Sequence, residues 1–307
     1  MTSTYHSGIH RFAVFTVCWT ILLFVAGALV TSKDAALSVS DWPKSHGSWV
    51  PPLRSLQGGD FFEFSHRFVA GVLGILTLLL AVLLVAGERR VWLRWLGATA
   101  VLGVVVQAIL GGQVVIQLLH YWLPVIHACF AQIVFAAVLA IAVFTSKWWV
   151  SERPQLEDKG SPSIHFVAML NAVVIYLQVI LGAGFRHKDI PIWPHAAGAL
   201  VVLATVTWTA VTLRRRFATS REFGVARMLL HAIFGMQFLL GLLAYWSRLT
   251  TAEAPQPIPL MVWLTVAHTV VGAILFAFSV LVVLMCYRLV PRGREVGATA
   301  ASEVSTG

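Results

Sequence analysis

Four histidines are the residues of this chain whose type and placement point most directly to chemistry. Each lies at or near the start of a long apolar segment: His66, His127, His195 and His268. A histidine inside a bilayer is energetically costly, and such a residue is by default a functional candidate. When the chain is threaded through a membrane, all four fall at the same depth on the same side. Two helices that present imidazoles at equal height can hold a flat metal cofactor between them.

The composition indicates which elements must position these histidines. The sequence is 58% hydrophobic and 11% charged, with a mean hydropathy of +0.82, whereas soluble domains carry about 25% charged residues. A helix that crosses roughly 30 Å of hydrocarbon needs about 20 apolar residues. Eight runs approach or exceed this length: Phe12–Val30, Phe68–Ala86, Trp95–Ile116, Leu123–Phe144, Phe166–Phe185, Ala196–Leu213, Met228–Trp246 and Leu260–Tyr287. Because the connections are short, we expect an all-α integral membrane protein with eight transmembrane helices.

The net charge of +9 would suit a nucleic-acid partner, but its distribution indicates topology instead. Most lysines and arginines fall on one side of the predicted membrane, at residues 89–94, 147–159 and 214–227 and in both tails. The positive-inside rule then places both termini in the cytoplasm. No arginine-rich presequence precedes Phe12, so we expect the bacterial cytoplasmic membrane, and no nucleic-acid partner.

The chain contains an internal repeat. The motif Gln-x-x-Leu-Gly occurs three times, at Gln107–Gly111, Gln178–Gly182 and Gln237–Gly241. A histidine follows each copy near the start of the next helix, while His66 follows a first helix that lacks the glutamine. Aligning 1–150 with 163–290 pairs His66 with His195 and His127 with His268. We therefore predict two four-helix halves, 1–150 and 151–307, in parallel repeat about a pseudo-two-fold axis along the membrane normal.

The type of metal site follows from the spacing of the histidines. Zinc favours clusters of cysteine, histidine and carboxylate ligands with close spacing. Single histidines on separate helices are typical of bis-imidazole haem iron in the core of a helical bundle. For any one histidine, a packing or proton-relay role stays open. Gly71, Gly198 and Gly272 follow three of the histidines closely, and we interpret them as room for a flat ring or a neighbouring backbone.

The two halves differ beside their first histidine. Glu63 stands three residues before His66, and its repeat equivalent is the apolar Ile192. Residues i and i+3 share a helix face, so this carboxylate can face the same cofactor as His66. The alternative is that Glu63 pairs with Arg67 or stabilises the helix N-terminus. The first half also has the longest outer loop, about residues 31–65, which we predict to cover a reactive site.

Together these features resemble the haem A synthase family over about residues 10–290. The features that carry the resemblance are Glu63-x-x-His66-Arg67, Asp41-Trp42-Pro43, the Gln-x-x-Leu-Gly repeats and the four histidines. The resemblance implies eight helices and two haem sites, and Glu63 matches the family's essential acidic position. It also implies that a ring methyl of haem O is oxidised, with oxygen from water, to the formyl group of haem A, which terminal cytochrome oxidases need.

The resemblance further assigns the histidines. His195 and His268 in the second half would bind the iron of haem b, an electron-transfer cofactor. His66 and His127 in the first half would bind the iron of haem O, the substrate. Haem propionates need cationic partners, and four residues lie at the right level: Arg67, Arg186, His187 and Lys188. These residues alternatively anchor helix ends at the membrane interface.

One departure from the family concerns cysteine. Many bacterial members carry a cysteine pair flanking Asp-Trp-Pro, where this chain has Val39 and Ser45. The three cysteines, Cys18, Cys129 and Cys286, lie within or at the end of predicted helices. We therefore expect no disulfide in the outer loop, and the electron route is left open.

The expected partners are haem O and the enzyme that makes it, an electron acceptor or donor, and the lipid bilayer; a homo-oligomer stays open. Two other functions also stay open. A quinone-linked di-haem b electron carrier would need four histidines but leaves Glu63 without a role. A parallel-repeat transporter would explain the symmetry but predicts broken helices and polar residues near the midplane, which are scarce here.

Overall fold

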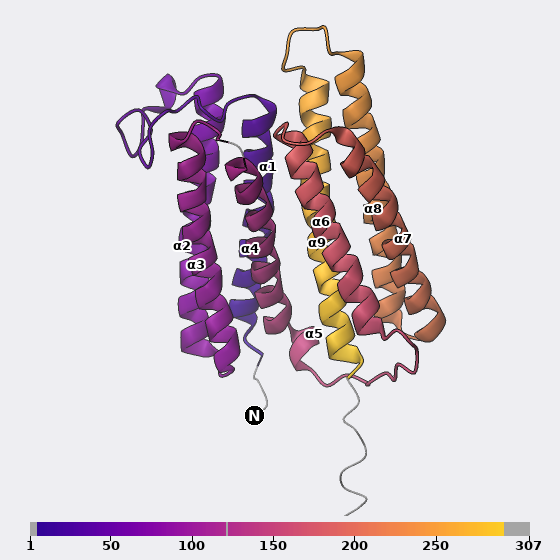
Figure 1. Ribbon diagram of the computed structural model, residues 1–307. Helices are drawn as coiled ribbons and strands as arrows, with labels where there is room; N and C mark the ends of the chain where they lie inside the picture. The colour runs from indigo at the N-terminus through magenta and orange to yellow at the C-terminus, as the bar shows by residue number, and fades with distance from the viewer. Residues whose placement is uncertain (1–4, 121, 292–307) are drawn as a thin grey trace, which may run out of the picture.

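The computed structural model describes residues 5–120 and 122–291, and within them the chain folds into helices (Figure 1). Eight helices are long and apolar enough to cross a membrane, which confirms the predicted all-α integral membrane fold. They are α1 (Ser7–Ser32), α2 (Gly59–Gly87), α3 (Val91–Ile116), α4 (Leu123–Thr145), α6 (Ile164–Arg186), α7 (Ile192–Arg216), α8 (Arg221–Thr250) and α9 (Pro259–Leu289). Two short helices, η1 (Leu53–Ser55) and α5 (Lys147–Val150), lie in the connections.

The helices extend beyond the apolar runs because polar end residues also adopt helical backbone. Helix α2 begins at Gly59 rather than near Phe68, so Glu63 and His66 are already within it. Prolines at the first positions of α4 and α9 suit a helix start, where a missing N–H costs nothing. Serine side chains cap α6 and α8, where Ser163 and Ser220 accept hydrogen bonds from main-chain N–H groups.

Helices α1 to α4 pack around one another, and α6 to α9 form a second group beside them (Figure 1). Between the groups, α1 and α4 contact α9, and α4 also contacts α6. Phe135 of α4 is buried there against Ala273 and Ala277 of α9, with Phe24 of α1 packed on the cluster. This arrangement is the one that two halves related by a pseudo-two-fold axis would produce, and the axis and the 1–150 and 151–307 division remain proposals.

We call the end where α1 begins and α9 ends the terminal face, and the opposite end the distal face. The connections after α1, α3, α6 and α8 lie at the distal face (Figure 1). Large apolar side chains are exposed along the spans, including Ile75, Leu203 and Met236. Lipid hydrocarbon would cover such side chains in a membrane. The four histidines lie near the distal ends of their helices.

Candidate functional site

Each of the four histidines packs against a glycine of the helix before it. A Cβ atom built on Gly27 of α1 would lie 3.1 Å from Cε1 of His66, and one on Gly111 of α3 would lie 3.2 Å from Cε1 of His127. The same distance is 2.9 Å between Gly182 and His195, and 2.8 Å between Gly241 and His268. Any larger residue would therefore displace the imidazole, so these glycines fix where each ring can lie.

In the second half, His195 of α7 and His268 of α9 face each other. Their ring centroids are 6.1 Å apart and the ring planes are nearly perpendicular, at 88°. A metal ion bound to two imidazoles at about 2.0–2.1 Å, as is typical of metal–imidazole bonds, would separate the centroids by roughly 6 Å. The pair is therefore spaced to hold one metal ion, such as haem iron, between the rings.

Hydrogen bonds orient these two rings. Nδ1 of His268 lies 3.1 Å from the main-chain oxygen of Gln237, to which it can only donate. In a neutral imidazole this leaves Nε2 unprotonated, and that atom lies 3.4 Å from Nε2 of Gln237, so a metal ion bound there would replace this contact. Gln178 donates from Nε2 to the main-chain oxygen of His195 at 2.7 Å, and the same nitrogen lies 3.1 Å from Nδ1 of His195. The glutamines of the repeated motif thus act on the histidines of the next helix.

The glycines that follow the histidines have different neighbours from those we expected. A Cβ atom on Gly198 would collide with Oε1 of Gln178, and one on Gly272 would lie 2.9 Å from Nε2 of Gln237. Gly71 has nothing within 4 Å of its Cβ position. In the second half, therefore, these glycines make room for the glutamine side chains that reach the histidines.

In the first half, His66 of α2 and His127 of α4 are close enough to interact electrostatically. Gln107 donates to the main-chain oxygen of His127 at 3.0 Å. The Nδ1 atoms of both rings are buried without a hydrogen-bond partner among the residues that the structure describes. Helix α1 carries Leu23 where the other three copies carry glutamine, four residues before Gly27. The first pair therefore has the same glycine contacts but fewer hydrogen bonds to its rings.

Glu63 is buried beneath the first distal loop. Its side chain accepts a hydrogen bond from the main-chain N–H of Val39 at 2.8 Å and another from Arg67. The Arg67 guanidinium also donates to the main-chain oxygens of Val39, Asp41 and Lys44. The predicted Glu63–Arg67 pair is thus present, and both residues hold the loop over the first half.

The loop is closed by its own contacts as well. Asp41 accepts hydrogen bonds from the main-chain N–H groups of Gly47 and His46, which hold the pKa of this carboxyl below its usual value. Trp42 lies directly on α3, because a Cβ atom on Gly112 would come within 2.6 Å of the indole. Gly112 is adjacent to Gly111, which contacts His127. Asp41-Trp42-Pro43 therefore lies close to the first histidine pair.

Two arginines and a histidine of the second half gather at the distal junction with the first. Arg186 at the end of α6 donates to Oγ of Ser32 in α1 at 2.7 Å. Arg248 of α8 lies over the Phe185 ring, 5.4 Å from its centroid, and interacts with Arg186. His187 interacts electrostatically with His127, and burial, together with Arg186, lowers the pKa of His187 to about 4.

The four rim residues selected from the sequence therefore have different surroundings. Arg186 and His187 lie at the junction, Lys188 is exposed, and Arg67 is engaged by the loop. Arg248 was not predicted from the sequence. The feature that could have indicated it is its position as a basic residue in the last turn of α8. Gly27 was also missed, because Leu23 breaks the motif that would have pointed to it. Cys18, Cys129 and Cys286 are all free thiols.

Comparison with known proteins gives one family. Residues 10–194 match the model of the COX15-CtaA family, described as cytochrome oxidase assembly protein. This match covers nearly all of the first half and ends beside His195.

Several curated relatives align over most of the chain. A protein of Lysinibacillus sphaericus (strain C3-41) named heme A synthase is 27% identical over 281 residues, which cover 79% of this chain and 87% of the relative. A heme A synthase of Geobacillus kaustophilus (strain HTA426) is 24% identical over 295 residues, which cover 90% of this chain and 91% of the relative. One from Listeria welshimeri (serovar 6b) is 24% identical over 306 residues, covering 88% of this chain and 90% of the relative.

Proposed function

The chain belongs to the COX15-CtaA family of cytochrome oxidase assembly proteins, and we infer that it is a haem A synthase. It is an oxidoreductase that converts haem O to haem A, and a multi-pass protein of a bacterial membrane. The site assignment rests on a difference between the two histidine pairs in the hydrogen bonds that their imidazole rings make. The rings of one pair are held by hydrogen bonds, and the Nδ1 atoms of the other pair have no hydrogen-bond partner among the described residues.

The second half binds haem b through His195 and His268. The 6.1 Å separation of the rings fits one iron between them. Donation from Nδ1 of His268 leaves its Nε2 unprotonated for that iron, which would replace the Gln237 amide 3.4 Å away. When bound, the haem supplies one-electron transfer. The chain's own contribution is to fix both rings, through Gly182 and Gly241 on one side and the glutamines on the other.

The first half binds haem O, the substrate, between His66 and His127. Each of the two oxidations of the ring methyl removes two electrons and two protons and adds one water oxygen. The geminal diol that results loses water to give the formyl group. These steps require a base for the protons and an external electron acceptor.

Glu63 is the base. It is the only carboxylate within one turn of a histidine of either pair among the described residues, and the second half has Ile192 at the equivalent position. A positioned carboxylate can accept protons and stabilise positive charge that develops on the reacting carbon. Val39 and Arg67 hold it in place by hydrogen bonds, and the closed loop excludes water from the carboxylate.

Arg186, His187 and Arg248 bind haem propionates at the junction. Arginine pairs well with carboxylates through two parallel hydrogen bonds. Since His187 interacts with His127, this cluster lies beside the first site although it belongs to the second half. Arg67 and Lys188 contribute less, because the loop engages the first and the second is exposed.

The terminal face is cytoplasmic and both haem sites lie toward the outer face. The basic connections after α2, α4 and α7 all lie at the terminal face, in accord with the positive-inside rule. Haem O is delivered by the enzyme that makes it.

The test is to extract haems from the protein purified after co-expression with a haem O-producing enzyme. We expect haem B together with haem A. Haem B alone would overturn the assignment in favour of an electron carrier, and the absence of any haem would leave the transporter.

A further inference from the structure

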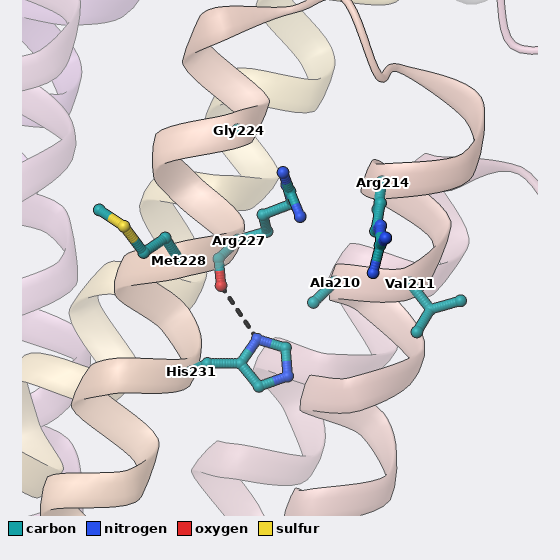
Figure 2. A pocket seen from close by; sticks show the side chains of 7 residues that line it. All are labelled: Ala210, Val211, Arg214, Gly224, Arg227, Met228 and His231. Carbon is teal, nitrogen blue, oxygen red and sulfur yellow. Dashed lines mark hydrogen bonds between the residues drawn. The ribbon is translucent and has the colours of Figure 1, made fainter.

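A groove lies between α7 and α8 near the terminal face, far from the histidine pairs. It encloses about 450 Å³, and Figure 2 shows Arg214 of α7 and Arg227 and His231 of α8 beside the space between the two helices. Arg214 lies nineteen residues beyond His195, which is roughly 28 Å along α7 at about 1.5 Å per residue. The groove is therefore separate from both proposed haem sites.

The groove carries positive charge that the described part of the protein does not neutralise. Neither Arg214 nor Arg227 has an ion-pair or hydrogen-bond partner for its side chain among the described residues. His231 is held by its Nδ1, which lies 3.0 Å from the main-chain oxygen of Arg227, so its Nε2 is left for another partner (Figure 2).

Two carboxylates at the same end of these helices are already engaged. Glu222 at the start of α8 pairs with Arg153 at 3.6 Å, and Asp158 pairs with Arg216 at 3.1 Å. Two guanidinium groups that face one space without a carboxylate are suited to an anion, and guanidinium matches the geometry of phosphate oxygens.

The groove also has an apolar side that opens to the surroundings. Val211 of α7 and Met228 of α8 both line it, with 38% and 62% of their surface exposed. Gly224 lines it too, and nothing lies within 4 Å of its Cβ position. Because α7 and α8 cross the membrane, these apolar side chains adjoin lipid chains, while the arginines lie at the level of headgroups.

We propose that this groove binds an anionic phospholipid, with its phosphate between Arg214 and Arg227 and an acyl chain along Val211 and Met228. Basic pockets between transmembrane helices commonly bind lipid headgroups of this kind. A free phosphate ion would use the arginines but gain nothing from the apolar side, so the structure favours the lipid. The proposal does not depend on the proposed catalytic function.

The experiment is native mass spectrometry of the full-length protein released from detergent, titrated separately with phosphatidylglycerol, phosphatidylcholine and inorganic phosphate. The variant carries Arg214→Gln and Arg227→Gln. The matched control carries Arg215→Gln and Arg221→Gln, which remove two exposed arginines of the same helices that do not line the groove. We expect the parent and the control to retain phosphatidylglycerol selectively, and the groove variant to bind it about tenfold more weakly, since hydrogen bonds to charged groups are lost.

A second variant, Gly224→Leu, fills the groove without changing its charge and should weaken phosphatidylglycerol binding as well. Circular dichroism and gel filtration check that each variant is folded. Equal loss of binding in the control pair, equal retention of phosphatidylcholine by the parent, or displacement of the lipid by an equimolar amount of inorganic phosphate would overturn the proposal. So would unchanged lipid binding in a folded Gly224→Leu protein.

Discussion

The two halves hold their histidine pairs in the same way on one side of each ring and differently on the other. All four imidazoles rest on a glycine of the preceding helix. In the second half, hydrogen bonds from Gln178 and to Gln237 orient the rings. In the first half, both Nδ1 atoms are buried without a partner in the described part of the chain, and Leu23 replaces the fourth glutamine. A ring fixed by hydrogen bonds suits a resident cofactor, whereas a ring held by packing alone suits a ligand that must arrive and leave.

The first half has in addition what the second half lacks. Glu63 lies one turn before His66, and Arg67 holds the loop over it through three main-chain oxygens. The equivalent stretch of the second half, Ile192-Trp-Pro-His195, carries no carboxylate. One arrangement of helices thus places a histidine pair in both halves, and a carboxylate beside that pair in one. The predictions below test this division.

The largest expected effect is that of Glu63→Gln. Loss of a general base typically lowers a rate about 10²–10⁴-fold, so conversion of haem O to haem A should fall by about 10²-fold or more while haem B content is unchanged. Haem O, or the alcohol that precedes haem A, should accumulate in the protein. Chromatography of extracted haems measures all three.

The matched control is Glu157→Gln, which neutralises an exposed carboxylate paired with Lys159. A normal haem A fraction in the Glu63→Gln protein, with only a lower yield, would assign Glu63 to holding the loop. An equal loss of haem A in the control would show that the effect is not specific to the site.

The next effect concerns the glutamine of the second half. Gln178→Leu should lower the affinity for haem b by about 10-fold or more, because groups that orient a metal-bound histidine typically change metal affinity 10–100-fold. Haem B content after extended washing in detergent measures this. Unchanged retention would mean that the glutamine only packs in the space beside Gly198.

The reciprocal change, Leu23→Gln, gives the first half the missing glutamine. It should slow the loss of haem O and haem A from the protein several-fold. This is less than the change expected for Gln178→Leu, because the new glutamine would orient only one of the two rings. The rate at which extracted haem content declines during washing in detergent measures this. Faster turnover and faster product release in this variant would contradict the idea that imidazoles without hydrogen bonds allow haem O to enter and haem A to leave.

A smaller effect is expected where packing alone is altered. Gly241→Ala places a methyl group about 2.8 Å from Cε1 of His268, and overpacking of this kind costs about 1–3 kcal/mol. Haem B occupancy should fall while the fold persists. Gly235→Ala on the same helix, where nothing lies within 4 Å, is the control and should leave occupancy unchanged.

The fold was largely predictable from the sequence, because a span of about 20 apolar residues is a strong signal in a chain with so few charges. The ends of the helices were less so: α2 begins at Gly59 because Asp60, Glu63 and Arg67 are polar and yet helical. The histidine pairs could be selected as candidates from the repeat, and Glu63 could be selected because its repeat equivalent, Ile192, is apolar.

The contacts between helices could not be predicted in the same way. The role of Gly27 depends on how α1 packs on α2, and the loop contacts of Arg67 depend on main-chain oxygens, which no sequence pattern specifies. Arg248 is a lone charge whose neighbours come from the end of α6. These positions are set by tertiary packing, which the repeat indicated but did not define.

The central claim is that His195 and His268 hold the resident haem b, while His66 and His127 hold the substrate. The most direct measurement is the haem content of the four single histidine-to-alanine variants, purified after co-expression with a haem O-producing enzyme. We predict that the His195 and His268 variants lose haem B, and that the His66 and His127 variants keep haem B but contain neither haem O nor haem A. Haem B lost from a folded first-half variant, or retained at the parental level in both second-half variants, would contradict this account.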